Sequence, residues 1–178
     1  NQFAQADMIT AAHCASVLSS MQQKYKYIIV DGPMRFDHGG AAVLNLAGLN
    51  LFVIQLLVTS VRNVHRMFAD LQDHGYSLDR FKLVCNRVGQ ESGHLGIEQV
   101  EKTLDRQISW QIPDDWRTVS SAINIGSPLS EIAPKSRICT AIREIAKHIV
   151  CPPDKTGTPP KSSSVKGGFL GRILSGAT

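Results

Sequence analysis

The sequence has no run of apolar residues long enough to form a membrane-spanning helix, which needs about 20 of them. We therefore expect no transmembrane helix, although 43% of the 178 residues are apolar. That fraction is enough for the core of one ordinary domain, with length left over for an appendage.

Cysteine is also scarce, and the four cysteines are far apart: Cys14, Cys85, Cys139 and Cys151. They form no Cys-x-x-Cys pair and no Cys/His spacing typical of a metal site. A disulfide framework and a zinc site are therefore not expected, and a reducing cytoplasm is the expected compartment. No signal-peptide pattern precedes the first helical pattern.

The sequence has little excess charge, and most of it lies in one place. The formal net charge is +4, and the residues from Cys151 onward hold four basic side chains against one acidic, Asp154. The first 150 residues are thus nearly neutral, which argues against a body that binds nucleic acid and makes the basic tail a separate question.

The body alternates helical periodicity with short apolar runs. Helices are predicted at roughly 7–23, 41–47, 59–74, 97–104, 114–126 and 136–150, and strands at 27–30, 49–58, 81–86 and 108–112. Thr59 or Ser60, Asp114 or Asp115, and Ser136 are the predicted helix caps. This alternation predicts an α/β fold with a mostly parallel sheet and helices on both faces.

Polar residues follow each predicted strand. They are Asp31-Gly32-Pro33, Thr59-Ser60, Asn86-Arg87 and Pro113-Asp114-Asp115. Ligands of open parallel sheets bind at the carboxyl ends of the strands, so these residues are the candidates for chemistry.

Asp31 ends an apolar run and is followed at once by Gly32 and Pro33. A carboxylate there could join a Mg²⁺ shell or orient water near a phosphate, with Gly32 permitting close backbone approach and Pro33 stiffening the turn. The plainer interpretation is that Asp31 caps a turn, and the pattern alone leaves both open.

Asn86 and the Ile112–Asp115 stretch can each be interpreted as a ligand contact or as an ordinary structural feature. The amide of Asn86 offers a donor and an acceptor, which suits the edge of a purine, but Asn is also a common turn residue. The loop at Pro113 and Asp115 could press on a base, or it could simply end a strand and cap a helix.

No phosphate loop occurs in the body. Such a loop is Gly-rich, carries a Lys and joins a strand to a helix. Lys166, Gly167 and Gly168 come near this pattern, but no strand precedes them and no Ser or Thr stands where Mg²⁺ would need one.

The end of the chain has its own organisation. Residues 151–166 have a linker composition of Pro, Lys, Ser and Gly, and residues 167–178 form a short tail. Phe169, Leu170, Ile173 and Leu174 fall on one helical face, flanked by Lys166 and Arg172. This pattern favours contact with an anionic membrane surface, strengthened if a dimer presents two copies, and a disordered tail is the alternative.

In their joint order, four segments resemble the later part of the ATPase domain of the CpaE/TadZ pilus-assembly proteins. The segments are "YKYIIVDGP", "LAGLNLFVIQLLVTSVRNVHRM", "GYSLDRFKLVCNR" and "VEKTLDRQISWQIPDDWRTVSSAINIGSPLSEIAPKS". The resemblance covers about residues 18–150, and 111–134 is its most specific part. These proteins belong to the ParA/MinD group of P-loop NTPases with a deviant Walker motif.

The resemblance implies a role for each matching position. Asp31 matches the Walker B acid near Mg²⁺ and the hydrolytic water, and Gly32 and Pro33 match the switch that senses the γ-phosphate. Asn86, with Arg87 beside it, matches the residue that reads adenine. Pro113 and Asp115 match the loop beside the base. The tail is similar to the membrane-targeting helix that ends MinD.

The family's Lys-Gly-Gly phosphate loop is absent, and the sequence begins at Asn1 without an initiator Met. We therefore expect these residues to be the later part of a longer product, with residues 1–150 contributing part of the ATPase domain. Alone they should neither bind ATP tightly nor hydrolyse it. The resemblance implies an ATP- and Mg²⁺-dependent homodimer in the bacterial cytoplasm, held at the inner membrane or a cell pole with pilus or secretion machinery. A non-catalytic localisation scaffold and a DNA-partition or flagellar-positioning ATPase are the alternatives.

Overall fold

The structure, a computed structural model, describes residues 10–32, 38–89 and 95–151. The predictions for Pro33 and for the membrane-contact residues of the tail lie outside these residues. The helices are α2 (Ala11–Gln22), α3 (His38–Leu46), α4 (Val58–Asp73), η1 (Leu78–Arg80, a 3-10 helix), α5 (Ile97–Leu104), α6 (Trp116–Ile125), α7 (Leu129–Ile132) and α8 (Arg137–Val150). The strands are β1 (Asn50–Ile54), β2 (Phe81–Val88) and β3 (Ile108–Pro113).

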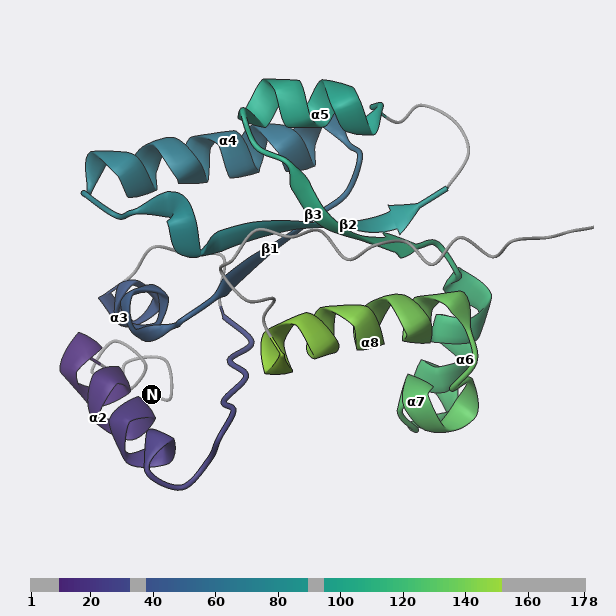
Figure 1. Cartoon of the computed structure of the whole chain (residues 1–178), viewed down its shortest axis with the longest axis horizontal. Helices are drawn as coiled ribbons and strands as arrows, with labels where there is room; N and C mark the ends of the chain where they lie inside the picture. Colours follow the sequence, from purple (N-terminus) through teal and green to yellow (C-terminus); the bar gives the residue numbers. More distant parts are fainter. Residues whose placement is uncertain (1–9, 33–37, 90–94, 152–178) are drawn as a thin grey trace, which may run out of the picture.

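The three strands form a parallel sheet in the order β1-β2-β3. Figure 1 shows α4 and α5 on one face of this sheet and α8 on the other. The predicted fold class, a parallel sheet with helices on both faces, is confirmed. Because all three strands are parallel, their carboxyl ends lie at one edge of the sheet.

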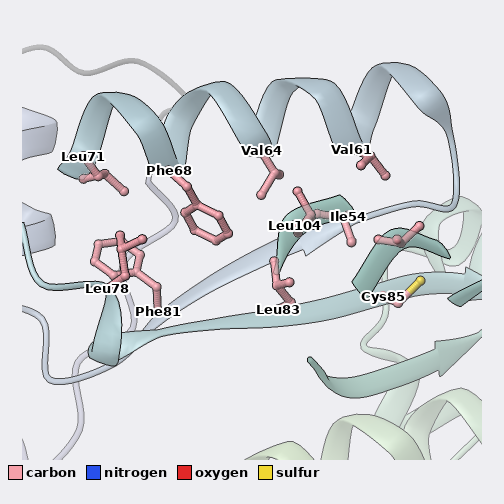
Figure 2. Close-up of a cluster of buried hydrophobic side chains, with 11 residues drawn as sticks. Ile54, Val61, Val64, Phe68, Leu71, Leu78, Phe81, Leu83, Cys85 and Leu104 are labelled. Carbon is pink, nitrogen blue, oxygen red and sulfur yellow. The ribbon is translucent and has the colours of Figure 1, made fainter. Parts of the chain in front are cut away.

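The hydrophobic core lies between the sheet and helices α4 and α5 (Figure 2). Helix α4 contributes a buried side chain every three or four residues, and these are Val61, Val64, Phe68 and Leu71. Spacing of this kind places them on one helical face, which packs onto Ile54, Leu83 and other buried residues of the sheet. The Phe52 and Phe68 rings meet edge to face with centroids 5.3 Å apart. This packed layer fixes the ends of β1 and β2 relative to α4.

Two of the predicted helix caps are confirmed and one is wrong. Asp115 caps α6 and Ser136 caps α8, each through its side chain. Helix α4 instead begins after Leu57, which makes no side-chain cap. The Ser60 hydroxyl accepts the backbone N–H of Gln55 at 3.1 Å, so it closes the turn after β1. The predicted 49–58 strand consequently ends at Ile54.

The strand predicted at residues 27–30 is also wrong. These residues are described, but they have no strand conformation, and the side chain of Ile29 is 96% exposed. A β-strand is held by hydrogen bonds to a neighbouring strand, and β1 pairs only with β2 in the described sheet. Without such a partner, an apolar run of the right length does not become a strand.

One face of β1 is open. Leu51 and Val53 point away from α4 and are 39% and 61% exposed, whereas Ile54 is buried. The apolar residues of β1 are thus covered on only one face by the described residues. None of the helices in the described stretches combines the length and the apolar character that crossing a membrane requires.

Candidate nucleotide-binding site

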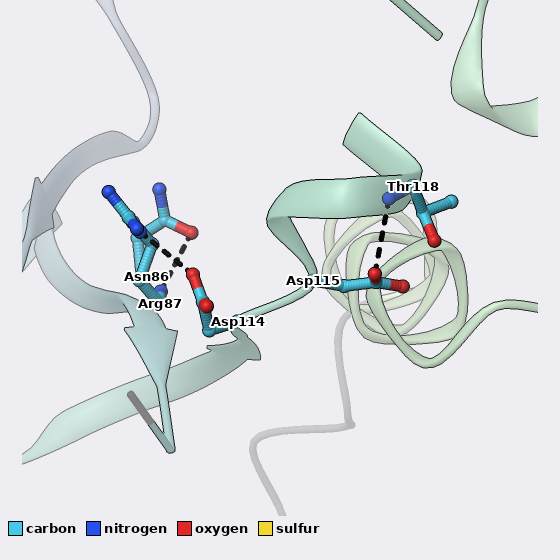
Figure 3. Close-up of polar contacts among 5 residues, drawn as sticks. All are labelled: Asn86, Arg87, Asp114, Asp115 and Thr118. Atoms are coloured by element: carbon cyan, nitrogen blue, oxygen red, sulfur yellow. Dashed lines mark hydrogen bonds and ion pairs between the residues drawn. The ribbon is translucent and has the colours of Figure 1, made fainter. Parts of the chain in front are cut away.

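The ends of β2 and β3 are joined by two contacts. The Arg87 Nε donates to Asp114 Oδ1 at 2.8 Å, forming an ion pair, and the backbone N–H of Asp114 donates to the carbonyl of Val88 at 2.9 Å. The side chain of Asp114 is only 16% exposed, so this pair is partly shielded from water. Figure 3 shows Asn86 and Arg87 beside each other, with Asp114 facing them from the end of β3.

Asn86 lies at a polar cavity of about 270 Å³. The cavity is formed by the end of β1, the first turns of α4 and the end of β2, and its polar lining residues are Gln55, Thr59, Ser60, Asn63 and Asn86. These side chains are uncharged and offer both donors and acceptors. The cavity therefore suits a neutral polar group, such as a nucleobase or a sugar, better than a free anion.

Arg87 has an unusual backbone, with φ of 59° in the left-handed region. Non-glycine residues enter this region at a cost, and they do so mainly where the surrounding structure holds them there. The register between β2 and β3 shifts at the same point, between Cys85 and Val88. The backbone N–H of Arg87 donates to the Asn86 Oδ1 at 2.9 Å. The left-handed backbone conformation of Arg87 and the orientation of the Asn86 side chain are thus linked by this hydrogen bond.

Pro113 and Asp115 have structural roles. Pro113 is the last residue of β3, and the Asp115 carboxylate accepts the backbone N–H of Thr118 at 3.3 Å (Figure 3). This is the strand end and helix cap of the plainer interpretation. It leaves the predicted contact with a base as a prediction, because capping uses only part of the carboxylate.

No family model matches the chain. An uncharacterized ATP-binding protein of Methanocaldococcus jannaschii, MJ0547, is 25% identical over 134 residues, which are 75% of this chain and 50% of that protein. The septum site-determining protein MinD of Thermotoga maritima is 24% identical over 153 residues, 84% of this chain and 56% of that protein. The chain thus spans about half the length of these curated relatives.

Solved structures decide the fold. A ParA family ATPase of Chlorobium tepidum superposes with a TM-score of 0.75 at 24% identity, covering 83% of this chain and 60% of that one. This chain has the ParA/MinD fold. MinD of Pyrococcus horikoshii, solved with Mg-ADP, superposes with a TM-score of 0.64 at 17% identity, covering 78% of this chain and 56% of that one. A MinD protein is also among the relatives found by sequence, in agreement with this fold.

Within this ParA/MinD fold, the structure brings together some predicted site residues and not others. Asn86, Arg87, Pro113 and Asp115 all lie at the carboxyl edge of the sheet, where Arg87 is joined to Asp114, and Asp115 contacts α6 instead. Asp31 is exposed and makes no hydrogen bond or ion pair with a described residue. A Cβ built on Gly32 would meet nothing within 4 Å, so no close approach requires glycine there. The roles predicted for Asp31 and Gly32 remain predictions.

Among the described residues, no group of three His, Cys, Asp or Glu side chains could hold a metal ion. A Mg²⁺ ion bound to a nucleotide takes few protein ligands, because water and phosphate oxygens fill most of its six positions. Asp31, the predicted carboxylate near Mg²⁺, is exposed, and this role stays a prediction. The described residues hold no preformed metal centre.

Two parts of the edge were not predicted. Asp114 was expected as one of the polar strand-end residues and as a possible helix cap, but its ion pair with Arg87 was not expected. Asn63 lies one turn into α4 and lines the cavity. The opposite charges of Arg87 and Asp114 at neighbouring strand ends could have predicted their ion pair. Asn63 lies within a helix that was predicted, but it does not directly follow a strand, and so the search at strand ends did not include it.

Cys85 precedes Asn86 but takes no part in the site. Its side chain is fully buried in the core, and burial raises the pKa of its thiol. A buried neutral thiol is a poor nucleophile.

Proposed function

We propose that this chain forms the base-binding side of a Mg-ATP site in a ParA/MinD-like ATPase. The observation that carries the proposal is the polar edge itself, where Asn86, Arg87 and the Pro113–Asp115 loop meet beside a polar cavity. In open parallel sheets this edge is where ligands bind. The names of the relatives support the choice of nucleotide, because one is called an ATP-binding protein and another was solved with Mg-ADP.

The proposed roles follow from the chemistry of each group. The Asn86 amide would read the hydrogen-bonding edge of adenine, and the loop at Pro113 would lie against the base. Asp31 would stand near Mg²⁺ and the hydrolytic water. No Lys-bearing glycine-rich loop that joins a strand to a helix was found in the sequence, so the phosphates would be held by a segment outside these residues. The open face of β1 and the exposed Tyr27, Ile29 and Val30 are consistent with further structure packing there.

The role of Asp31 can be tested in a protein that also carries the phosphate loop. We expect Asp31→Ala to lower ATP hydrolysis strongly, because the carboxylate acts on Mg²⁺ and water during the reaction. ATP affinity should change much less, because base contacts and phosphate contacts remain. Steady-state hydrolysis and nucleotide-binding titration would separate the two effects. Equal turnover in wild type and variant would contradict the role of Asp31.

For the biological role, we propose a CpaE/TadZ-like protein that positions or assembles a pilus or secretion machine. ATP would control homodimer formation, and the protein would act in the bacterial cytoplasm, at the inner membrane or a cell pole. The support is the order of motifs over residues 18–150. Neighbouring genes for pilins and a secretion ATPase are the expected finding. A neighbouring gene for a centromere-binding protein would favour DNA partition instead.

A role in placing the division septum is the second candidate, because a relative that matches 84% of this chain is a septum site-determining MinD. A solved MinD of Aquifex aeolicus, 22% identical with a TM-score of 0.69, is complexed with MinC and covers 87% of this chain and 63% of that one. Deleting the gene discriminates between the roles. Loss of pili with normal septa supports the pilus role, and misplaced septa with normal pili support the MinD role.

The tail would hold the dimer at an anionic membrane surface through Phe169, Leu170, Ile173 and Leu174, with Lys166 and Arg172 at the headgroups. Deleting residues 167–178 should abolish sedimentation with vesicles that contain anionic lipid. Vesicles of neutral lipid are the control. Unchanged sedimentation of the shortened protein would remove the membrane role from the proposal.

A further inference from the structure

The side-chain amide of Asn86 is fixed in one orientation. A backbone N–H can donate only to an acceptor, so the Asn86 atom 2.9 Å from the Arg87 nitrogen must be the amide oxygen. The NH₂ group is left without a hydrogen bond to any described residue, while the side chain lines the polar cavity. Asn86 therefore presents its NH₂ as a donor, with the second lone pair of its oxygen beside it as an acceptor.

This orientation depends on the backbone of Arg87. The N–H that donates to the Asn86 oxygen belongs to a residue with φ of 59°, a left-handed conformation that strains a non-glycine residue. With the chain on both sides held in place, Arg87 could reach an ordinary strand conformation only if the planar peptide unit between Asn86 and Arg87 rotated. That rotation would turn the Arg87 N–H away from the Asn86 oxygen. The Asn86 amide would then be free to rotate and to exchange its donor and acceptor ends.

The ion pair with Asp114 holds Arg87 in place. Asp114 contacts the end of β2 twice, through its carboxylate to Arg87 and through its backbone N–H to Val88. The next residue, Asp115, starts α6 by capping it, so the chain is fixed on both sides of the ion pair. Figure 3 shows this arrangement, with the two carboxylates serving different elements.

We propose that Arg87 and Asp114 are a positioning pair that sets base selectivity, by holding Asn86 in the orientation that matches adenine and opposes guanine. The inference rests on the proposed nucleotide site. Adenine presents an acceptor at N7 beside a donor at N6, which complements the fixed NH₂ and oxygen of Asn86. Guanine presents acceptors at both N7 and O6, so its O6 would face the Asn86 oxygen. An amide that rotates freely would discriminate less between the two bases.

The test compares ATP with GTP on the full chain, using NMR titration at millimolar nucleotide. Wild type should bind ATP about tenfold more tightly than GTP, within the discrimination expected of a paired Asn contact. Arg87→Ala and the milder Asp114→Asn should reduce this preference to about twofold or less, because each loosens the hold on Asn86. The matched control is Glu144→Gln, which removes the ion pair between Glu144 and Lys147 on α8 and should keep the wild-type preference.

Each outcome has one meaning. A general loss of folding weakens ATP and GTP alike and leaves their ratio unchanged, so the ratio isolates the positioning role from stability. An unchanged ratio in folded Arg87→Ala and Asp114→Asn overturns the inference and leaves the nucleotide site intact. If neither nucleotide shifts any amide of the wild-type chain, the proposed function fails, and the inference fails with it.

Discussion

Replacing Arg87 should reverse the usual order of alanine and glycine in a β-strand. Arg87→Ala and Arg87→Gly both remove the ion pair with Asp114, and both keep the backbone N–H that Asn86 accepts. They differ in how they tolerate φ of 59°. Alanine must either keep the strain of the left-handed conformation or leave that conformation and lose the hydrogen bond to Asn86, whereas glycine adopts it freely.

The size of the reversal follows from two opposing terms. Glycine avoids a strain of about 1–2 kcal/mol, but it gives the unfolded chain more freedom, which costs about 0.4–1 kcal/mol. Arg87→Gly should therefore be more stable than Arg87→Ala by about 0.5–1 kcal/mol. The lost ion pair, with Arg87 40% exposed, should lower the free energy of unfolding of both variants by no more than about 1 kcal/mol.

Urea denaturation followed by circular dichroism measures these differences. Lys82 is the matched control, because it lies in the same strand at an exposed position without a positive φ. There the ordinary order should hold, with Lys82→Ala more stable than Lys82→Gly by about 0.5–1 kcal/mol. If alanine is as stable as glycine at position 87, or more stable, then Arg87 is not strained and the positioning argument loses its basis.

Three further results are expected from other parts of the molecule. Leu71→Ala should lower the free energy of unfolding by about 2–5 kcal/mol, because Leu71 is fully buried. Val53→Ala, on the open face of β1, should change it by about 0.5 kcal/mol or less. Denaturation curves for both variants test this contrast. The free energy of unfolding should fall as the pH rises above about 8.5, the ordinary thiol pKa, because the unfolded chain then releases the Cys85 proton that the folded chain retains. Cys85→Ala should reduce this fall of stability with pH. A thiol reagent at neutral pH should label the exposed Cys151 rapidly and the buried Cys85 only on unfolding, as mass spectrometry of labelled peptides would show.

Much of the fold was predictable because its signals are local. The predicted range of α5 agrees with the structure, and the caps at Asp115 and Ser136 were identified from single side chains at helix starts. The alternation of strands and helices was enough to predict a parallel sheet and to direct attention to its carboxyl edge.

The failures have a common physical cause, which is that the local pattern does not say which partner a residue takes, whether that partner is distant in the sequence or a few residues away. Residues 27–30 have the composition of a strand but lack a neighbouring strand in the described sheet. Ser60 is of a residue type that often caps helices, but its hydroxyl accepts the backbone N–H of Gln55 instead. The ion pair between Arg87 and Asp114 joins residues that only the sheet brings together. Local pattern does not contain these choices.

The most direct measurement is an NMR titration of the wild-type chain with ATP and, separately, with adenosine. If this chain supplies the base-binding side, both ligands should shift the amides of residues 86–88 and 113–118, and their affinities should be similar and in the millimolar range. The reason is that no phosphate loop lies within these residues, so the triphosphate adds little. Shifts that are absent from this edge, or tight binding of ATP that adenosine does not share, would contradict the proposed site.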